Sequence, residues 1–114
     1  MPDPSGPEGP TVLIFDFPHA DFGPERTAAL KPLAQDIAGQ PGLVWKIWTE
    51  EPPAGRAGGV YLFETRAAAE AYHAMHAARL AARGVTGIDA TYRGVNEVLT
   101  AIDRGPVQAG RSGQ

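Results

Sequence analysis

Residues 42–50, with the sequence GLVWKIWTE, constrain the fold more than any other stretch, because they hold both tryptophans and a dense run of β-favouring residues. Pro41 and Gly42 punctuate its start, so we predict a strand. Side chains alternate between the two faces of a strand. One face is therefore predicted to carry Leu43, Trp45, Ile47 and Thr49, and the other Val44, Lys46, Trp48 and Glu50. The two tryptophans then point in opposite directions, and each brings a large apolar area that needs cover. Helices of a two-layer domain cover only one face, so we expect a partner chain or a ligand on the second.

Composition limits the class of protein. A chain of 114 residues with 43% hydrophobic content predicts one domain with a modest core. The net charge of −3 argues against a nucleic-acid partner, and the absence of cysteine excludes disulfides, thiolate nucleophiles and cysteine metal sites. No apolar run is long enough to span a membrane, and the N-terminal residues do not resemble a signal peptide. We therefore expect a soluble cytoplasmic protein with no nucleic-acid or membrane partner.

Both ends of the chain are rich in glycine and proline and poor in large apolar side chains. We expect residues 1–10 and 104–114 to be disordered tails that flank a single domain at residues 11–103. Within this domain, residues 11–17 form a nearly continuous apolar run, which predicts a central strand buried on both faces.

A helix is expected next. Asp21 is its predicted cap, and Leu30, Leu33 and Ile37 recur at the spacing of an inward-facing stripe. After the tryptophan strand, residues 51–58 predict a long polar hairpin loop.

The second half of the chain repeats the pattern of strand and helix. Residues 59–63 predict a strand antiparallel to the tryptophan strand, and Thr65 is a candidate cap for a helix at residues 66–83. One face of this helix carries Ala69, Tyr72, His76 and Leu80. Residues 88–93 predict a fourth strand, and a short helix capped by Asn96 follows, with Leu99 and Ile102 expected to pack inward.

The order βαββαβ is typical of an α+β ferredoxin-like fold with an antiparallel sheet in the strand order 4-1-3-2. The tryptophan strand then lies at a sheet edge. An apolar edge strand left open would aggregate, so we expect the protein to be a homodimer.

Five segments, which follow one another without large gaps, resemble the YdhR-type mono-oxygenase family: residues 30–34, 41–50, 58–63, 76–80 and 95–97. The run Trp-Lys-Ile-Trp-Thr-Glu at 45–50 is the most distinctive of them. The chain departs from the family in its two tails, in a shorter loop after the first strand, and in Val98, where the family often has proline.

The resemblance implies a dimeric α/β barrel, in which two ferredoxin-like subunits close their sheets into one barrel, with pockets between each sheet and its helices. Its superfamily includes cofactor-independent oxygenases of phenol- or quinone-like molecules and haem-degrading enzymes. The predicted function is a cofactor-independent mono-oxygenase acting on a small planar aromatic compound. The alternatives are a non-catalytic dimer that binds a hydrophobic small molecule or haem, with His76 as haem ligand, and a dimeric scaffold without chemistry. The sequence leaves open the substrate, turnover itself, and any need for flavin, haem or metal.

His76 is the candidate catalytic residue. It is spaced i, i+3 from His73, as in some metal sites, but no third ligand is identifiable by spacing. His76 is either a core histidine with one hydrogen bond or an acid/base on a pocket wall, and the resemblance favours the second.

The candidate substrate-binding residues are Trp45, Lys46, Trp48, Tyr61, Tyr72 and Arg79. Lys46 either pairs with Glu50 or polarises a substrate oxygen, and Arg79 either binds an anionic group or extends into solvent. The aromatic residues are either core and interface side chains or the walls of a cavity for a planar ligand.

Overall fold

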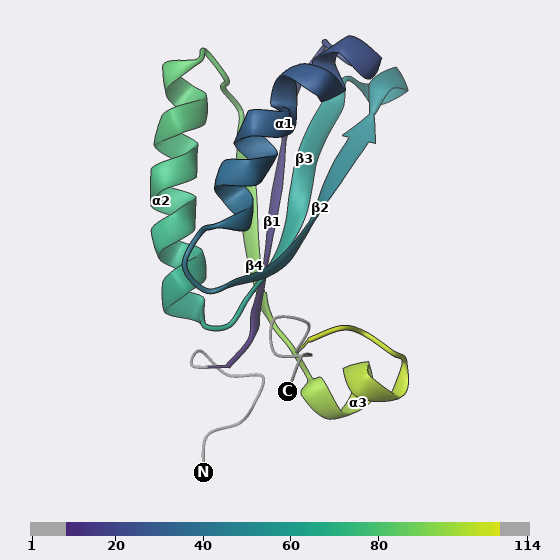
Figure 1. Ribbon diagram of the computed structural model, residues 1–114, viewed down its shortest axis with the longest axis vertical. Coiled ribbons are helices and arrows are strands. Elements are labelled where there is room, and N and C mark those ends of the chain that lie inside the picture. Colours follow the sequence, from purple (N-terminus) through teal and green to yellow (C-terminus); the bar gives the residue numbers. More distant parts are fainter. Residues whose placement is uncertain (1–8, 108–114) are drawn as a thin grey trace.

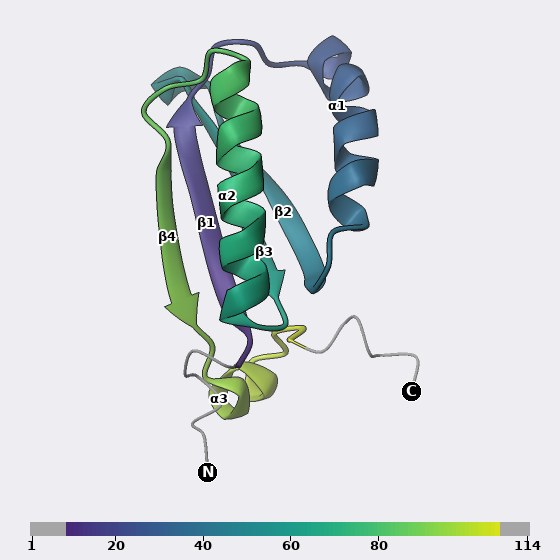
Figure 2. The same cartoon turned by 90° about the vertical axis from the view of Figure 1, so that its left-hand side faces the viewer.

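The computed structural model describes residues 9–107, in which helices α1 and α2 cover one face of a four-stranded sheet (Figures 1 and 2). Its elements are β1 (Thr11–Pro18), α1 (Pro24–Ala38), β2 (Leu43–Glu51), a 3-10 turn (Pro52–Ala54), β3 (Arg56–Phe63), α2 (Arg66–Ala82), β4 (Asp89–Gly94) and α3 (Glu97–Ile102). The strand order is β2-β3-β1-β4, and every neighbouring pair is antiparallel. This confirms the predicted ferredoxin-like fold, with the tryptophan strand at one edge.

The core lies between the sheet and the helices α1 and α2, and α1 contributes the buried Ile37 to it. The side chains of α2 that are buried are the four that the helical spacing predicted, Ala69, Tyr72, His76 and Leu80. They pack on the inner residues of β1 and β3, of which Leu13, Phe15, Tyr61 and Phe63 are fully buried. The Thr65 side chain accepts a hydrogen bond from the Ala68 amide at 3.1 Å, so the predicted cap is confirmed.

The two tryptophans of β2 lie on opposite faces, as predicted. Trp48 pairs with Gly59 on the face toward the helices, and Trp45 pairs with Leu62 on the outer face. The predicted face of Leu43 is wrong, because a bulge between Leu43 and Trp45 shifts the register. Leu43 therefore pairs with Phe63 and packs on the core instead of sharing a face with Trp45.

Three further local predictions differ from the structure. The strand β1 is central, but its outer face is open, because both helices cover the other face and Ile14 stays 36% exposed. The hairpin loop is shorter than expected, since pairing continues to Glu51 and resumes at Arg56. Gly23, instead of Asp21, is the N-cap of α1, and it makes no side-chain cap hydrogen bond.

Helix α3 lies beyond the end of the sheet, away from the core (Figure 1). Leu99 and Ile102 were expected to pack inward, but they are 59% and 72% exposed because no layer of the fold faces them there.

The ends of the predicted domain also extend further than expected. The Trp45 Nε1 donates a hydrogen bond to the Pro106 carbonyl at 2.9 Å, and the Val95 amide donates to the Pro10 carbonyl at 3.2 Å. Residues 9–10 and 104–107 therefore pack against the folded unit. The predicted disorder of residues 1–8 and 108–114 falls outside the described residues.

Candidate functional site

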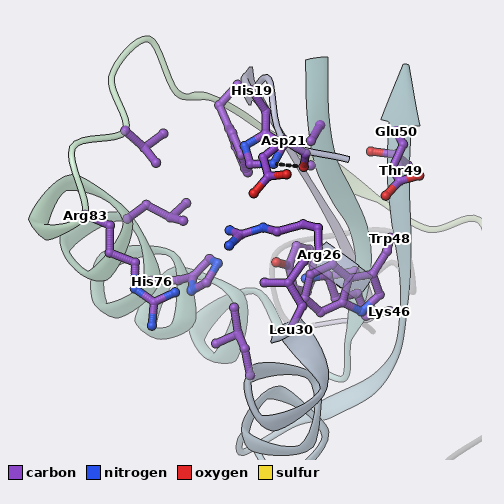
Figure 3. Close-up of a pocket in the computed structure, with 17 residues that line it drawn as sticks. His19, Asp21, Arg26, Leu30, Lys46, Trp48, Thr49, Glu50, His76 and Arg83 are labelled. Carbon is purple, nitrogen blue, oxygen red and sulfur yellow. Dashed lines mark hydrogen bonds between the residues drawn. The ribbon is translucent and has the colours of Figure 1, made fainter. Parts of the chain in front are cut away.

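A pocket opens between the helices and the sheet, at the end where β1 and β2 finish and α1 begins (Figure 3). Its volume is about 220 Å³. Leu30, Leu33 and Leu80 provide apolar wall, together with the rings of Phe17 and Trp48. Its titratable lining consists of His19, Asp21, Arg26, Lys46, Glu50, Tyr61, His76 and Arg83.

Lys46 enters the pocket from β2 with its amine between two aromatic faces. Its Nζ lies 3.4 Å from the ring centroid of Trp48 and 4.6 Å from that of Tyr61. Gly59 provides the space, because a Cβ at this position would come within 2.6 Å of the Lys46 Cε. Lys46 forms no ion pair with any residue between 9 and 107, so the proposed pairing with Glu50 is absent from the described structure. Burial, followed by the positive charge of Arg79, lowers the pKa of Lys46 to about 7.

His76 occupies the wall opposite, on α2. Its side chain is buried, and its ring stacks on Tyr72 at 5.0 Å between centroids. The Arg79 Nε donates a hydrogen bond to His76 Nδ1 at 3.2 Å. Burial, and then the positive charges of Arg79, Lys46 and Arg83, lower the pKa of His76 to about 4. At neutral pH the imidazole is therefore uncharged and carries its proton on Nε2.

Arg79 contacts this histidine on the side that faces away from the pocket. In addition to its bond to His76, its Nη1 donates to Asp36 Oδ2 of α1 at 2.8 Å, which connects the two helices. This hydrogen bond lowers the pKa of Asp36. Arg79 does not line the pocket, so in this arrangement it positions His76 and does not itself reach a ligand.

A pair of tyrosines supports the same wall. The Tyr72 hydroxyl donates to the Tyr61 hydroxyl at 3.0 Å. Burial raises the pKa of both, that of Tyr72 to about 12, so both phenols are neutral at physiological pH.

The structure thus separates the candidate site residues into two groups. His76, Lys46, Trp48 and Tyr61 line the pocket together. Tyr72 and Arg79 lie behind His76, and Trp45 lies on the opposite face of the sheet. His73 bonds through Nδ1 to the Tyr92 hydroxyl at 2.5 Å, so the two histidines of α2 have different hydrogen-bond partners. Among the described residues, 9–107, no three potential metal ligands lie together.

Sequence reasoning missed Arg26, whose guanidinium extends from α1 into the pocket (Figure 3). The signal for it is present, because Arg26 precedes Leu30, Leu33 and Ile37 at the same helical spacing and so continues the inward stripe by one turn. His19, Asp21 and Arg83 were also missed. They lie at the ends of elements or in a connection, where no periodicity indicates a direction.

Comparison with protein families identifies a match over most of the described chain. The family described as "Putative mono-oxygenase ydhR" matches residues 12–106, which is most of the chain. The chain belongs to this family. The match includes every residue that lines the pocket, so the pocket lies within the part of the chain that the family describes.

A search of curated proteins finds no match to this chain. Within residues 9–107, no helix has the length and apolar character needed to cross a membrane.

The environment of His76 predicts a loss of stability in acid. Its pKa is about 4 in the folded state and about 6.5 in an unfolded chain, so between these values the unfolded state binds a proton that the native state does not. The free energy of unfolding should therefore fall as the pH drops from 6.5 to 4, by up to about 1.4 kcal/mol per pH unit from this group.

Urea unfolding at several pH values, at one protein concentration, measures this effect in the parent and in His76→Gln. Carboxylates titrate in both proteins, whereas only the parent has the histidine. The difference between the two curves should shrink as the pH falls. Parallel curves would contradict the assignment.

Proposed function

We propose that this protein is a mono-oxygenase that acts on small planar phenol- or quinone-like compounds, works as a homodimer and needs no bound cofactor. Membership of the mono-oxygenase family supports the reaction class. The observation that carries the proposal is the half-buried Lys46 side chain, whose amine lies between Trp48 and Tyr61 in a largely apolar pocket without a carboxylate partner in the described chain. Such an amine can take a proton from a bound phenol and then stabilise the phenolate.

The chemistry uses the electrons of the substrate. With 1-naphthol, the hydroxyl proton passes to the amine, and the phenolate gives one electron to O2, which forms a phenoxyl radical and superoxide. These combine at the ring carbon para to the oxygen to form a peroxide anion, which takes the proton back from the Lys46 ammonium and becomes a hydroperoxide. Cleavage of its O–O bond with loss of the ring proton gives 1,4-naphthoquinone and water. One oxygen atom enters the product and the other leaves as water, which balances the four-electron oxidation.

The residues divide this work between them. Lys46 has its pKa near the working pH and is therefore the better proton acceptor. His76 was expected to take this role, but the Arg79 hydrogen bond occupies its Nδ1, so we assign it as a donor through Nε2–H to the oxygen that gains charge. The Trp48 ring and the leucines of α1 and α2 provide apolar surface for the planar ring.

The homodimer is proposed from the outer face of the sheet. Ile47 is 56% exposed and Ile14 is 36% exposed on this face, with Val60 half-buried between them and Val12 half-buried next to Ile14 along β1. A second copy that covers these side chains would bury the apolar edge strand β2 and complete a barrel.

Oxygen uptake by the purified protein with 1-naphthol tests the proposal. We expect one O2 consumed for each quinone formed, and one labelled oxygen atom in the product when ¹⁸O2 is supplied. The protein is first dialysed against a chelator and checked for flavin by absorbance. Uptake no faster than in buffer, or uptake only after flavin or metal is added, would contradict the proposed function.

A further inference from the structure

Arg26 differs from the paired arginines of the described chain. Arg56, Arg66 and Arg79 each pair with a carboxylate. Arg26 makes no ion pair with residues 9–107, and its Nε is buried without a hydrogen-bond partner. The Nη2 of Arg79 is buried without a partner too, but the guanidinium of Arg79 is already bonded to His76 and Asp36. A guanidinium nitrogen that has lost water and gained no acceptor is costly, so this position favours a ligand that supplies an acceptor.

The pocket around Arg26 carries an excess of positive side chains. Arg26, Lys46 and Arg83 line it, with His19 and His76, against two carboxylates, Asp21 and Glu50. In Figure 3, Glu50 lies at the far rim beside Thr49, whereas the guanidinium of Arg26 extends toward the wall that carries His76 and Arg83. Asp21 is the nearer acid, but it forms no ion pair with Arg26. An anion at this end of the pocket would therefore meet mainly positive charge.

The remaining lining limits the rest of the ligand. Leu30, Leu33 and Leu80 are apolar, and a cavity of about 220 Å³ exceeds the roughly 150 Å³ that accepts benzene. One or two fused rings fit this space. A planar guanidinium binds a carboxylate through two parallel hydrogen bonds, which suits a ligand with one anionic group and an apolar body.

We propose that the pocket binds a small aromatic carboxylic acid, with its carboxylate on Arg26 and its ring against the leucines of α1 and α2. The proposal rests on the same pocket as the proposed function: aromatic acids are the ligands that this pocket binds most tightly, and neutral phenols such as 1-naphthol bind there more weakly. It concerns binding alone, so it is separable from turnover.

Titration calorimetry with two ligands of one shape tests the proposal. The probes are 2-naphthoate and its neutral isostere 2-naphthamide. The parent should bind the acid about ten- to a hundredfold more tightly than the amide, as expected for a charged hydrogen-bonded pair. Arg26→Gln should remove this preference and leave the affinity for 2-naphthamide within about twofold of the parent value. Arg26→Lys should retain part of the preference, because it keeps the charge and loses the two-point geometry.

Two controls make the result specific to Arg26. Arg83→Gln removes another positive charge from the same pocket, and Arg93→Gln removes an exposed one from β4. Arg93→Gln should keep the preference in full. Arg83→Gln should reduce it less than Arg26→Gln does, because it removes a charge from the pocket but not the two direct hydrogen bonds to the carboxylate. The proposal would be overturned if the parent binds the acid and the amide equally, or binds neither. It would also be overturned if the preference survives in Arg26→Gln or disappears equally in Arg83→Gln. Binding of the acid without oxidation of 1-naphthol would contradict only the proposed function, and oxidation without a preference for the acid would contradict only this inference.

Discussion

Replacing Lys46 with methionine should lower the turnover of 1-naphthol by about 10²-fold or more, as expected for the loss of a general base. Methionine keeps most of the apolar stem that passes Trp48 and Tyr61, so the fold should persist. In the parent, the amine accepts a proton only when it is neutral. The rate should therefore rise with pH through about 7, the pKa of this lysine, and the rise should be absent in the variant.

Two further variants separate the roles of Lys46 as a base and as a cation. Lys46→Arg keeps the positive charge but cannot give up its proton, so it should be nearly as slow as the methionine variant. Lys31→Met removes the other lysine of the chain, which is exposed on α1, and should turn over at the parent rate. An arginine variant as active as the parent would show that Lys46 only holds an anion, and the mechanism would need another base.

The fold was predictable because its signals are periodic and local. The spacing of Ala69, Tyr72, His76 and Leu80 marked the buried face of α2, and the order of elements gave the sheet topology. The errors lie where one residue changes the outcome. A single bulge moved Leu43 to the core face, which alternation within β2 alone cannot reveal.

The site was less predictable, because its chemistry depends on distances between elements. Helical spacing placed His76 on the inner face, but it gave no sign that Arg79 bonds its Nδ1 and thereby changes which proton it carries. Nor does the sequence of β2 show that Gly59, on the neighbouring strand, leaves room for the stem of Lys46. Each of these facts joins residues on different turns or different strands, and only the folded chain brings them together.

Replacing Ile47 with glutamate should convert the proposed homodimer into a monomer. Ile47 lies on the outer face of the edge strand β2 and is 56% exposed in the single chain, so a charged side chain there meets water in the monomer and costs little stability. In a dimer that covers this face, the same carboxylate would be buried without a partner, which is strongly unfavourable. Light scattering during gel filtration should give about twice the 12.0 kDa chain mass for the parent and the chain mass for the variant.

Ala78→Glu is the matched control, because it places the same charge at an exposed position of α2, on the side of the molecule away from the outer face. It should remain a dimer. A monomeric parent would refute the homodimer, and a dimeric Ile47→Glu would refute this face as its interface.

The same variant also tests whether the pocket depends on the dimer, because β2 carries Ile47 on one face and Lys46 and Trp48 on the other. If closing the barrel holds β2 in place, Ile47→Glu should weaken binding of 2-naphthoate together with dimerisation, whereas an independent pocket would bind it unchanged.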